Sequence, residues 1–136
     1  MTTVARTRLA SARYGAEFTE ENFDTADLAS VSLDHLRLTR CSFLGADLRH
    51  ATLDNCSFKL CNLRGASLRG ASLRFANLAG CDLGGADLRD CDLTGARFGF
   101  VNTGDDTGLS NLAGADLTGA RLSDTTFERV LGWPAE

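Results

Sequence analysis

The chain has 136 residues, 43% of them hydrophobic, and its 18 acidic and 14 basic residues give a net charge of −4. No apolar run approaches the ~18 residues that a membrane helix requires, which excludes a membrane-spanning class, and the acidic balance gives no reason to expect direct nucleic-acid binding. The first residues are polar or basic with no apolar stretch behind them, so we expect no signal peptide and a single cytoplasmic domain.

Residues 1–15 precede the regular part of the chain and are predicted to form an N-terminal cap. Within them, Thr7 to Tyr14 are expected to fold as a short helix or an irregular lid, with Leu9 and Tyr14 facing the core. A cap is needed because a repetitive β-structure otherwise exposes its core and its unpaired strand edges at each end.

From residue 16 to residue 130 the sequence repeats with a period of five residues. Leu or Phe recurs at every fifth position from Phe18 to Phe98, and the same spacing returns from Leu112 to Phe127. The residue two positions before each Leu or Phe is usually small or apolar, and the remaining positions are mostly polar or Gly. A period of five fits neither an α-helix, at about 3.6 residues, nor a strand, at about 2. Each repeat must therefore bury two side chains and then turn the chain.

Three segments show the repeat most clearly: Ala46-Asp47-Leu48-Arg49, Ala86-Asp87-Leu88-Arg89 and Ala115-Asp116-Leu117-Thr118-Gly119. They resemble the A-(D/N)-L-X-X unit of pentapeptide repeat proteins. This resemblance implies an all-β fold, a right-handed quadrilateral parallel β-helix in which four units form one coil of about 20 residues and the coils stack at ~4.8 Å. Residues 16–130 would then form five to six coils of this solenoid.

Like residues should stack at 20-residue spacing in such a coil, and the sequence agrees. Cys41, Cys61 and Cys81 would share one interior column, and Phe18 would share another with Phe58. All five cysteines of the chain occupy the small inward position that Ala fills in other repeats. We therefore expect buried, reduced thiols, and we predict no disulfide, no metal site and no cofactor.

The repeat is interrupted between Thr103 and Leu112, where counting by fives leaves four extra residues. We place this insertion at residues 104–107, and its Gly and Asp content predicts a surface turn. In the Qnr-type members of the family that the chain resembles, loops that leave the coil help to bind a topoisomerase. That likeness makes Asp105 and Asp106 candidate partner contacts. The alternatives are a tolerated insertion without a role and a cation site formed by the two carboxylates.

Charge is distributed in bands along the chain. Residues 17–34 contain six acids and no base, and four of them are candidate partner contacts: Glu17, Glu20, Asp24 and Asp27. Residues 35–80 hold seven bases against two acids. Arg69 lies both in a ring of bases around one coil and in a column of arginines at 20-residue spacing. This basic band is either neutralised by neighbouring acids or forms a groove for a phosphate, a nucleic acid or an acidic partner.

Two further surfaces are candidates for contact with a partner. Leu60 and Phe100 occupy outward positions and would share one corner of the coil, which predicts an exposed apolar patch. Residues 131–136 are predicted to form a C-terminal cap. There, Leu131 and Trp133 are expected either to cover the last coil or to form a homodimer contact through this end.

No Ser, Cys or acid has the local context of a catalytic nucleophile, and neither a phosphate loop nor a dinucleotide-binding motif is present. We therefore expect a non-enzymatic binding module. The resemblance to Qnr-type quinolone-resistance proteins implies a DNA mimic that binds a type II topoisomerase, DNA gyrase, and protects it from inhibitors, although the net charge of −4 is smaller than such mimicry suggests. The alternatives are a protein-interaction scaffold of unassigned partner and, less favoured, an enzyme of unrecognised type.

Overall fold

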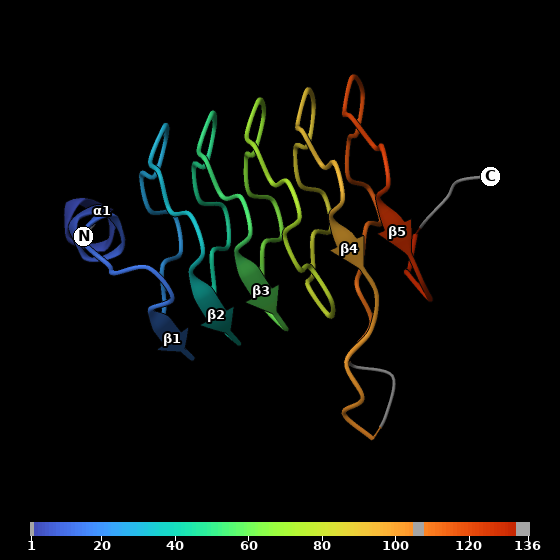
Figure 1. Cartoon of the computed structure of the whole chain (residues 1–136), viewed down its shortest axis with the longest axis horizontal. Helices are drawn as coiled ribbons and strands as arrows, with labels where there is room; N and C mark the ends of the chain where they lie inside the picture. The colour runs from blue at the N-terminus through green and yellow to red at the C-terminus, as the bar shows by residue number, and fades with distance from the viewer. Residues whose placement is uncertain (1, 105–107, 133–136) are drawn as a thin grey trace.

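The computed structural model describes residues 2–104 and 108–132. It begins with one helix, α1 (Thr2–Ala10), followed by a stack of coils that carries five short strands (Figure 1). The strands are β1 (Glu17–Thr19), β2 (Arg37–Thr39), β3 (Ser57–Lys59), β4 (Arg97–Phe98) and β5 (Thr126–Phe127). All five lie on the same side of the stack, which we call the strand side.

The coils are held together by parallel pairing at a step of 20 residues. Phe18 pairs with Leu38 and Leu38 with Phe58, and single bridges such as Ser32 to Thr52 repeat this step on the other sides of the coil. The strands are short because the chain turns after every five residues, which leaves only two or three residues for pairing on each side. The predicted all-β quadrilateral architecture is confirmed.

The corners are two-residue turns whose second residue has a positive φ. In the turn from Phe23 to Ala26, the Ala26 N–H donates to the Phe23 carbonyl at 3.2 Å, and Thr25 has a φ of 57°. These are the features of a type II turn, which glycine enters without steric cost. Gly95, with a φ of 71°, has a second role, because the ring of Phe75 from the preceding coil lies where a Cβ would be.

The core is a continuous column of the two inward side chains of each repeat. Phe43 and Phe58 are each 1% exposed, and their rings meet edge to face with centroids 6.0 Å apart. Phe23 stacks on Phe43 at 5.2 Å, one coil further along. Burial of this apolar surface, at about 25 cal/mol per Å², is the main source of stability in a solenoid of this kind.

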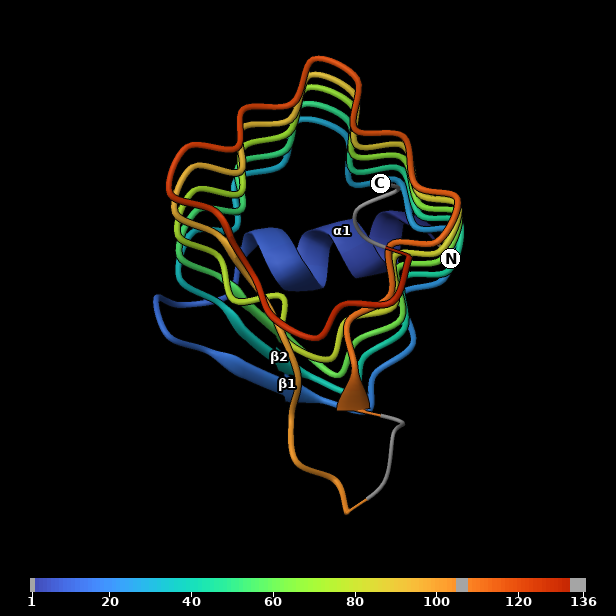
Figure 2. The same cartoon turned by 90° about the vertical axis from the view of Figure 1, so that its right-hand side faces the viewer.

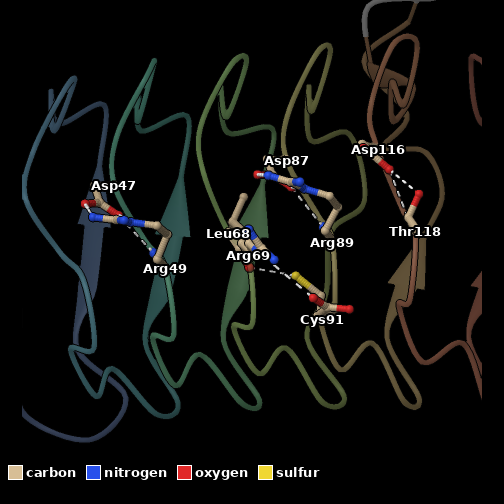
Figure 3. Close-up of polar contacts among 10 residues, drawn as sticks. Asp47, Arg49, Leu68, Arg69, Asp87, Arg89, Cys91, Asp116 and Thr118 are labelled. Atoms are coloured by element: carbon tan, nitrogen blue, oxygen red, sulfur yellow. Dashed lines mark hydrogen bonds and ion pairs between the residues drawn. The ribbon is translucent and has the colours of Figure 1, made fainter.

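The five cysteines are free and buried, so the predicted burial of the thiols is confirmed. Burial raises the pKa of Cys56 and of Cys91 to about 12. The Cys91 thiol donates a hydrogen bond to the Leu68 carbonyl at 2.8 Å (Figure 3). Cys41 and Cys61 lie in adjacent coils of one column, and a hydrogen bond between their thiols raises the pKa of Cys61 and lowers that of Cys41. These thiols act as slightly larger alanines in the core.

The N-terminal end of the core is covered by α1, which crosses the end of the stack (Figure 2). Leu9 is 1% exposed and packs on the first coil, as predicted. Tyr14 is different: it was predicted to face the core, but it is 78% exposed and stacks on the His35 ring with centroids 4.3 Å apart. Ala12 and Ala16 pack against the core beside Leu9, so the phenol ring is directed outward.

The insertion is longer than the sequence count of four residues at 104–107. Asn62 pairs with Asp82 at the regular step of 20, but Asp82 pairs with Asn111, a step of 29. The fifth coil therefore contains nine extra residues, which leave the corner after β4 as a protruding loop (Figures 1 and 2). Counting by fives cannot distinguish an insertion of nine residues from one of four, because the two differ by one whole repeat.

Among the described residues, those of the last coil are less buried than those of the first coils. The inward side chains Leu117, Leu122 and Phe127 are only partly buried, and Leu131 is 50% exposed. Phe127 stacks on Phe98 with centroids 5.1 Å apart. The rest of the predicted C-terminal cap, including Trp133, lies outside the described residues.

Candidate partner-binding surfaces

The acids of the first coil divide into free and occupied carboxylates. Glu17, Glu20 and Asp27 are exposed, and none of them forms an ion pair with the described part of the chain. Asp24 is half-buried, because its carboxylate accepts hydrogen bonds from the Ser42 hydroxyl and from the Leu44 N–H, the latter at 3.0 Å. Three of the four predicted contact acids are thus open to a partner, and Asp24 supports the next coil instead.

The arginine column consists of Arg49, Arg69 and Arg89, and the structure shows that two of its three members are neutralised (Figure 3). Arg49 forms two hydrogen bonds to Asp47, at 2.8 and 2.7 Å. Arg89 binds Asp87 in the same way, at 2.9 and 2.8 Å.

The hydrogen bonds from Arg89 lower the pKa of Asp87 to about 2. Bidentate pairing of this kind occupies the donors that would otherwise bind a carboxylate or a phosphate. The column is therefore largely occupied by its own chain.

Arg69 differs from its neighbours because its repeat has Ser67 where the other two have Asp. Its guanidinium Nε lies 3.7 Å from an Asp90 carboxylate oxygen, and the side chain is 52% exposed. In the ring of bases around this coil, Arg74 is paired in the same loose way with Asp92 at 3.9 Å, whereas Arg64 donates hydrogen bonds to both carboxylate oxygens of Asp82, at 3.2 and 3.3 Å. Exposed pairs of this kind contribute little energy, but they balance the charge of this part of the surface.

Leu60 and Phe100 do not form the predicted exposed corner, because both side chains are half-buried. Leu60 packs over Gly80, where an added Cβ would lie 2.7 Å from its Cδ2 atom. Phe100 bridges Leu109 at the base of the inserted loop, and the Arg129 guanidinium lies 4.6 Å from its ring centroid. Both side chains are thus less exposed than predicted, and their predicted contact with a partner stays a prediction.

Ser110 holds the inserted loop to the coil and was not identified from the sequence. It is fully buried, and its hydroxyl donates to the Leu78 carbonyl at 2.7 Å while accepting from the Gly80 and Gly99 N–H groups at 3.1 Å. Together with the bond from the Ser110 N–H to the Gly99 carbonyl at 2.9 Å, these bonds hold the returning end of the loop against the coil. The sequence did contain a sign of this role. Ser110 is the small inward residue two positions before Leu112, and it places a hydroxyl in the column that Cys41, Cys61 and Cys81 occupy in earlier coils.

Asp105 and Asp106 lie outside the described residues, so their predicted contacts stay predictions. Within residues 2–104 and 108–132, no group of His, Cys, Asp and Glu side chains has the arrangement of a metal site. In the same part of the chain, no helix has the length and apolar character needed to cross a membrane.

The repeat that builds these surfaces matches known families. A family model described as a pentapeptide repeat region matches residues 31–106, and a second, described as pentapeptide repeats, matches residues 110–131. The chain belongs to the pentapeptide repeat family. The gap between the two matches falls at the inserted loop.

Solved structures of pentapeptide repeat proteins share this fold. One from the Arabidopsis thaliana thylakoid lumen is 25% identical, with a TM-score of 0.52 over 82% of this chain and 68% of its own. QnrB1, a plasmid-mediated fluoroquinolone resistance protein, is 20% identical, with a TM-score of 0.52 over 87% of this chain and 70% of its own. No curated protein matches the chain. The likeness to these structures establishes that the chain folds as a right-handed β-helix. The likeness to QnrB1 establishes nothing beyond this fold.

The two histidines of this pentapeptide repeat protein lie on corners of different coils. His35 Nδ1 is 2.8 Å from an Asp34 carboxylate oxygen, at an angle that does not make a hydrogen bond, and its ring is covered by Tyr14. His50 lies over Gly70 on the surface. Neither histidine contacts a thiol or hydroxyl in the described chain in the way that nucleophilic catalysis requires.

Proposed function

We propose that this protein is a non-enzymatic binding module that acts in the cytoplasm as a DNA mimic. In this proposal it binds a type II topoisomerase, DNA gyrase, and protects the enzyme from inhibitors. The observation that carries the proposal is the set of unpaired carboxylates on the first coil, Glu17, Glu20 and Asp27. The fold that the chain shares with QnrB1, a fluoroquinolone resistance protein, supports the choice of enzyme to test.

The geometry of the coil suits this role because it fixes charge on a rigid frame. Glu17 lies on β1, Glu20 is a corner residue with a φ of 55°, and Asp27 is bridged to Asp47 of the next coil. Binding then orders only the side chains, because the backbone that carries these carboxylates is already fixed by the coil. A basic protein surface that binds the phosphates of DNA would attract these carboxylates over a Debye length of about 10 Å at moderate salt.

The test is a DNA supercoiling assay with purified gyrase and a fluoroquinolone. We expect added protein to restore supercoiling in the presence of the drug, and the triple variant E17Q/E20Q/D27N to require at least about tenfold more protein for the same effect, which corresponds to ~1.4 kcal/mol of binding. The amide substitutions keep the shape of each side chain and remove only its charge.

A matched control removes three acidic charges from the other end of the solenoid. The variant D116N/D124N/E128Q changes exposed residues of the last coils and leaves the first coil intact. It should protect as well as the parent protein. Equal loss in both variants would show a general effect of net charge, and no protection by the parent protein would refute the proposal.

We extend the proposal to a homodimer formed through the C-terminal end. The support comes from residues 108–132, where Leu117, Leu122 and Phe127 are only partly buried and Leu131 is half exposed. A second copy that covered this end would bury the core and pair the free edge of the coil. Sedimentation equilibrium of the purified protein tests this extension.

The second candidate function is a protein-interaction scaffold whose partner is not a topoisomerase. It is favoured by the strand side of the solenoid, where four exposed basic side chains form no ion pair in the described part of the chain. That surface adjoins the first-coil acids, since Glu17 pairs in register with Arg37, and its partner is considered next.

A further inference from the structure

The strand side carries a group of four basic residues, and its nearest acid is Glu17 of β1, which pairs in register with Arg37. Its four segments, 37–40, 57–60, 77–80 and 97–100, contain four bases and no acid, in a protein whose net charge is −4. The acids nearest to it along this side are Glu17 and Glu20 in the first coil and Glu128 beyond β5. We call the four exposed bases the basic face: Arg37, Arg40, Lys59 and Arg97.

The four residues of the basic face share two features, exposure on one side of the stack and the absence of ion pairs, and the second is also found at Arg6, Arg13, Arg121 and Arg129 in the described chain. Ion pairs elsewhere in the described chain hold the following arginines: Arg8, Arg49, Arg64, Arg69, Arg74 and Arg89. Within residues 2–104 and 108–132, no member of the basic face forms one, and Arg97 makes only a long hydrogen bond of 3.4 Å to the Asn77 side-chain oxygen. The fold thus neutralises the arginine column and leaves the cations of the strand side free to bind another molecule.

The pairing register places these cations on a flat and rigid surface. β1, β2 and β3 form one parallel sheet, seen side by side in Figure 1. The register continues from Ser57 to Asn77 and from Asn77 to Arg97, so Arg37 and Arg97 belong to one row across four coils. Three strand spacings separate the two ends of this row, which is about 14 Å. Lys59 stands beside the row, between Thr39 and the buried Ala79.

We propose that the basic face binds an acidic, extended segment of a partner protein. An extended chain rises about 3.3 Å per residue, so five residues span about 14 Å and present carboxylates on alternate positions about 7 Å apart. That length matches the separation of Arg37 and Arg97, so two carboxylates of such a segment would face the two ends of the row. Ser57 and Asn77 lie between the two arginines and offer polar side chains to the segment.

A nucleic acid fits this surface less well than an acidic polypeptide does. The basic face offers four cations, fewer than the roughly six to ten phosphate contacts of a protein whose affinity for duplex DNA is strongly salt-dependent. Single strands are held by stacking of bases on exposed aromatic rings, and the only aromatic side chains in the four segments are inward Phe58 and Phe98 and half-buried Phe100.

The test uses the full-length protein and a fluorescein-labelled peptide of ten glutamates, followed by fluorescence anisotropy at low and moderate salt. The basic-face variant is R37Q/R40Q/K59Q/R97Q. We expect the parent protein to bind the peptide, the variant to bind it at least about tenfold more weakly, and the affinity of the parent to fall with added salt. A thermal unfolding midpoint equal to that of the parent protein establishes that the variant is folded.

The control variant, R64Q/R69Q/R74Q/R89Q, removes the same number of charges from arginines that already have acidic partners. It should bind the peptide within about twofold of the parent protein. Three results would overturn the proposal: no peptide binding by the parent, equal loss in both variants, or tighter binding of a ten-nucleotide single strand than of the peptide. Self-association that the basic-face variant abolishes would identify a second copy as the occupant instead. The first-coil acids are unchanged in these variants. A negative result with the peptide would therefore not refute the topoisomerase proposal, which the supercoiling assay tests separately.

Discussion

We expect Phe58→Ala to lower the free energy of unfolding by about 3–5 kcal/mol, because it removes a buried ring and leaves a cavity in the core. Phe58 is 1% exposed, meets the Phe43 ring at 6.0 Å and lies between two leucines of its column, Leu38 and Leu78. Neighbouring coils are too tightly linked by hydrogen bonds for the cavity to close. Equilibrium urea denaturation, followed by circular dichroism, measures the loss.

The control for this prediction makes the same change at an outward position. Phe75 is 58% exposed and lies over Gly95 of the next coil, so Phe75→Ala removes a ring that is already largely in water. It should cost under about 1 kcal/mol. If the two variants lost similar stability, the assignment of inward and outward positions would be wrong.

The second large effect is expected at the N-terminal cap, where Leu9→Ala should cost about 2–5 kcal/mol. Leu9 is 1% exposed and is the residue by which α1 closes the end of the core. A solenoid gains stability from contacts between neighbouring units, so the loss should appear first in the first coil. Hydrogen exchange of the amides of β1 and of Phe23 should accelerate more than that of β3.

Val4 provides the comparison on the same helix. It is 57% exposed, and Val4→Ala should leave both the unfolding midpoint and the exchange of the first coil nearly unchanged. Equal acceleration in both variants, or exchange that rises uniformly over all coils, would contradict a capping role for Leu9.

The sequence predicted the architecture because the repeat encodes it locally. Every inward Leu or Phe from Phe23 to Phe98 is buried, and the spacing of Cys41, Cys61 and Cys81 marked the interior column that the 20-residue pairing step creates. Tyr14 escaped prediction because it precedes the repeat, and its direction is set by packing of α1 rather than by periodicity. The half-burial of Leu60 and Phe100 escaped because it depends on where the inserted loop leaves the coil.

The candidate surfaces were predicted in part. Asp47 and Arg49, two residues apart, were already expected to be able to neutralise each other, and the structure shows the bidentate pair. The sequence could not show which sides of the coil have paired basic residues and which have unpaired ones. The basic face becomes visible only when ion pairs are assigned, because its members are separated by acids in other repeats along the chain. Ser110 was missed because its role arises from the geometry of the insertion.

The most direct test of the proposed function is competition between this protein and duplex DNA for gyrase. Labelled duplex bound to the enzyme is titrated with the protein, and fluorescence anisotropy reports displacement. Mimicry predicts complete displacement, with an apparent dissociation constant that rises in proportion to the duplex concentration, and at least about tenfold weaker displacement by E17Q/E20Q/D27N. Binding of the protein to the enzyme–DNA complex without displacement of the duplex, or no binding at all, would contradict the account.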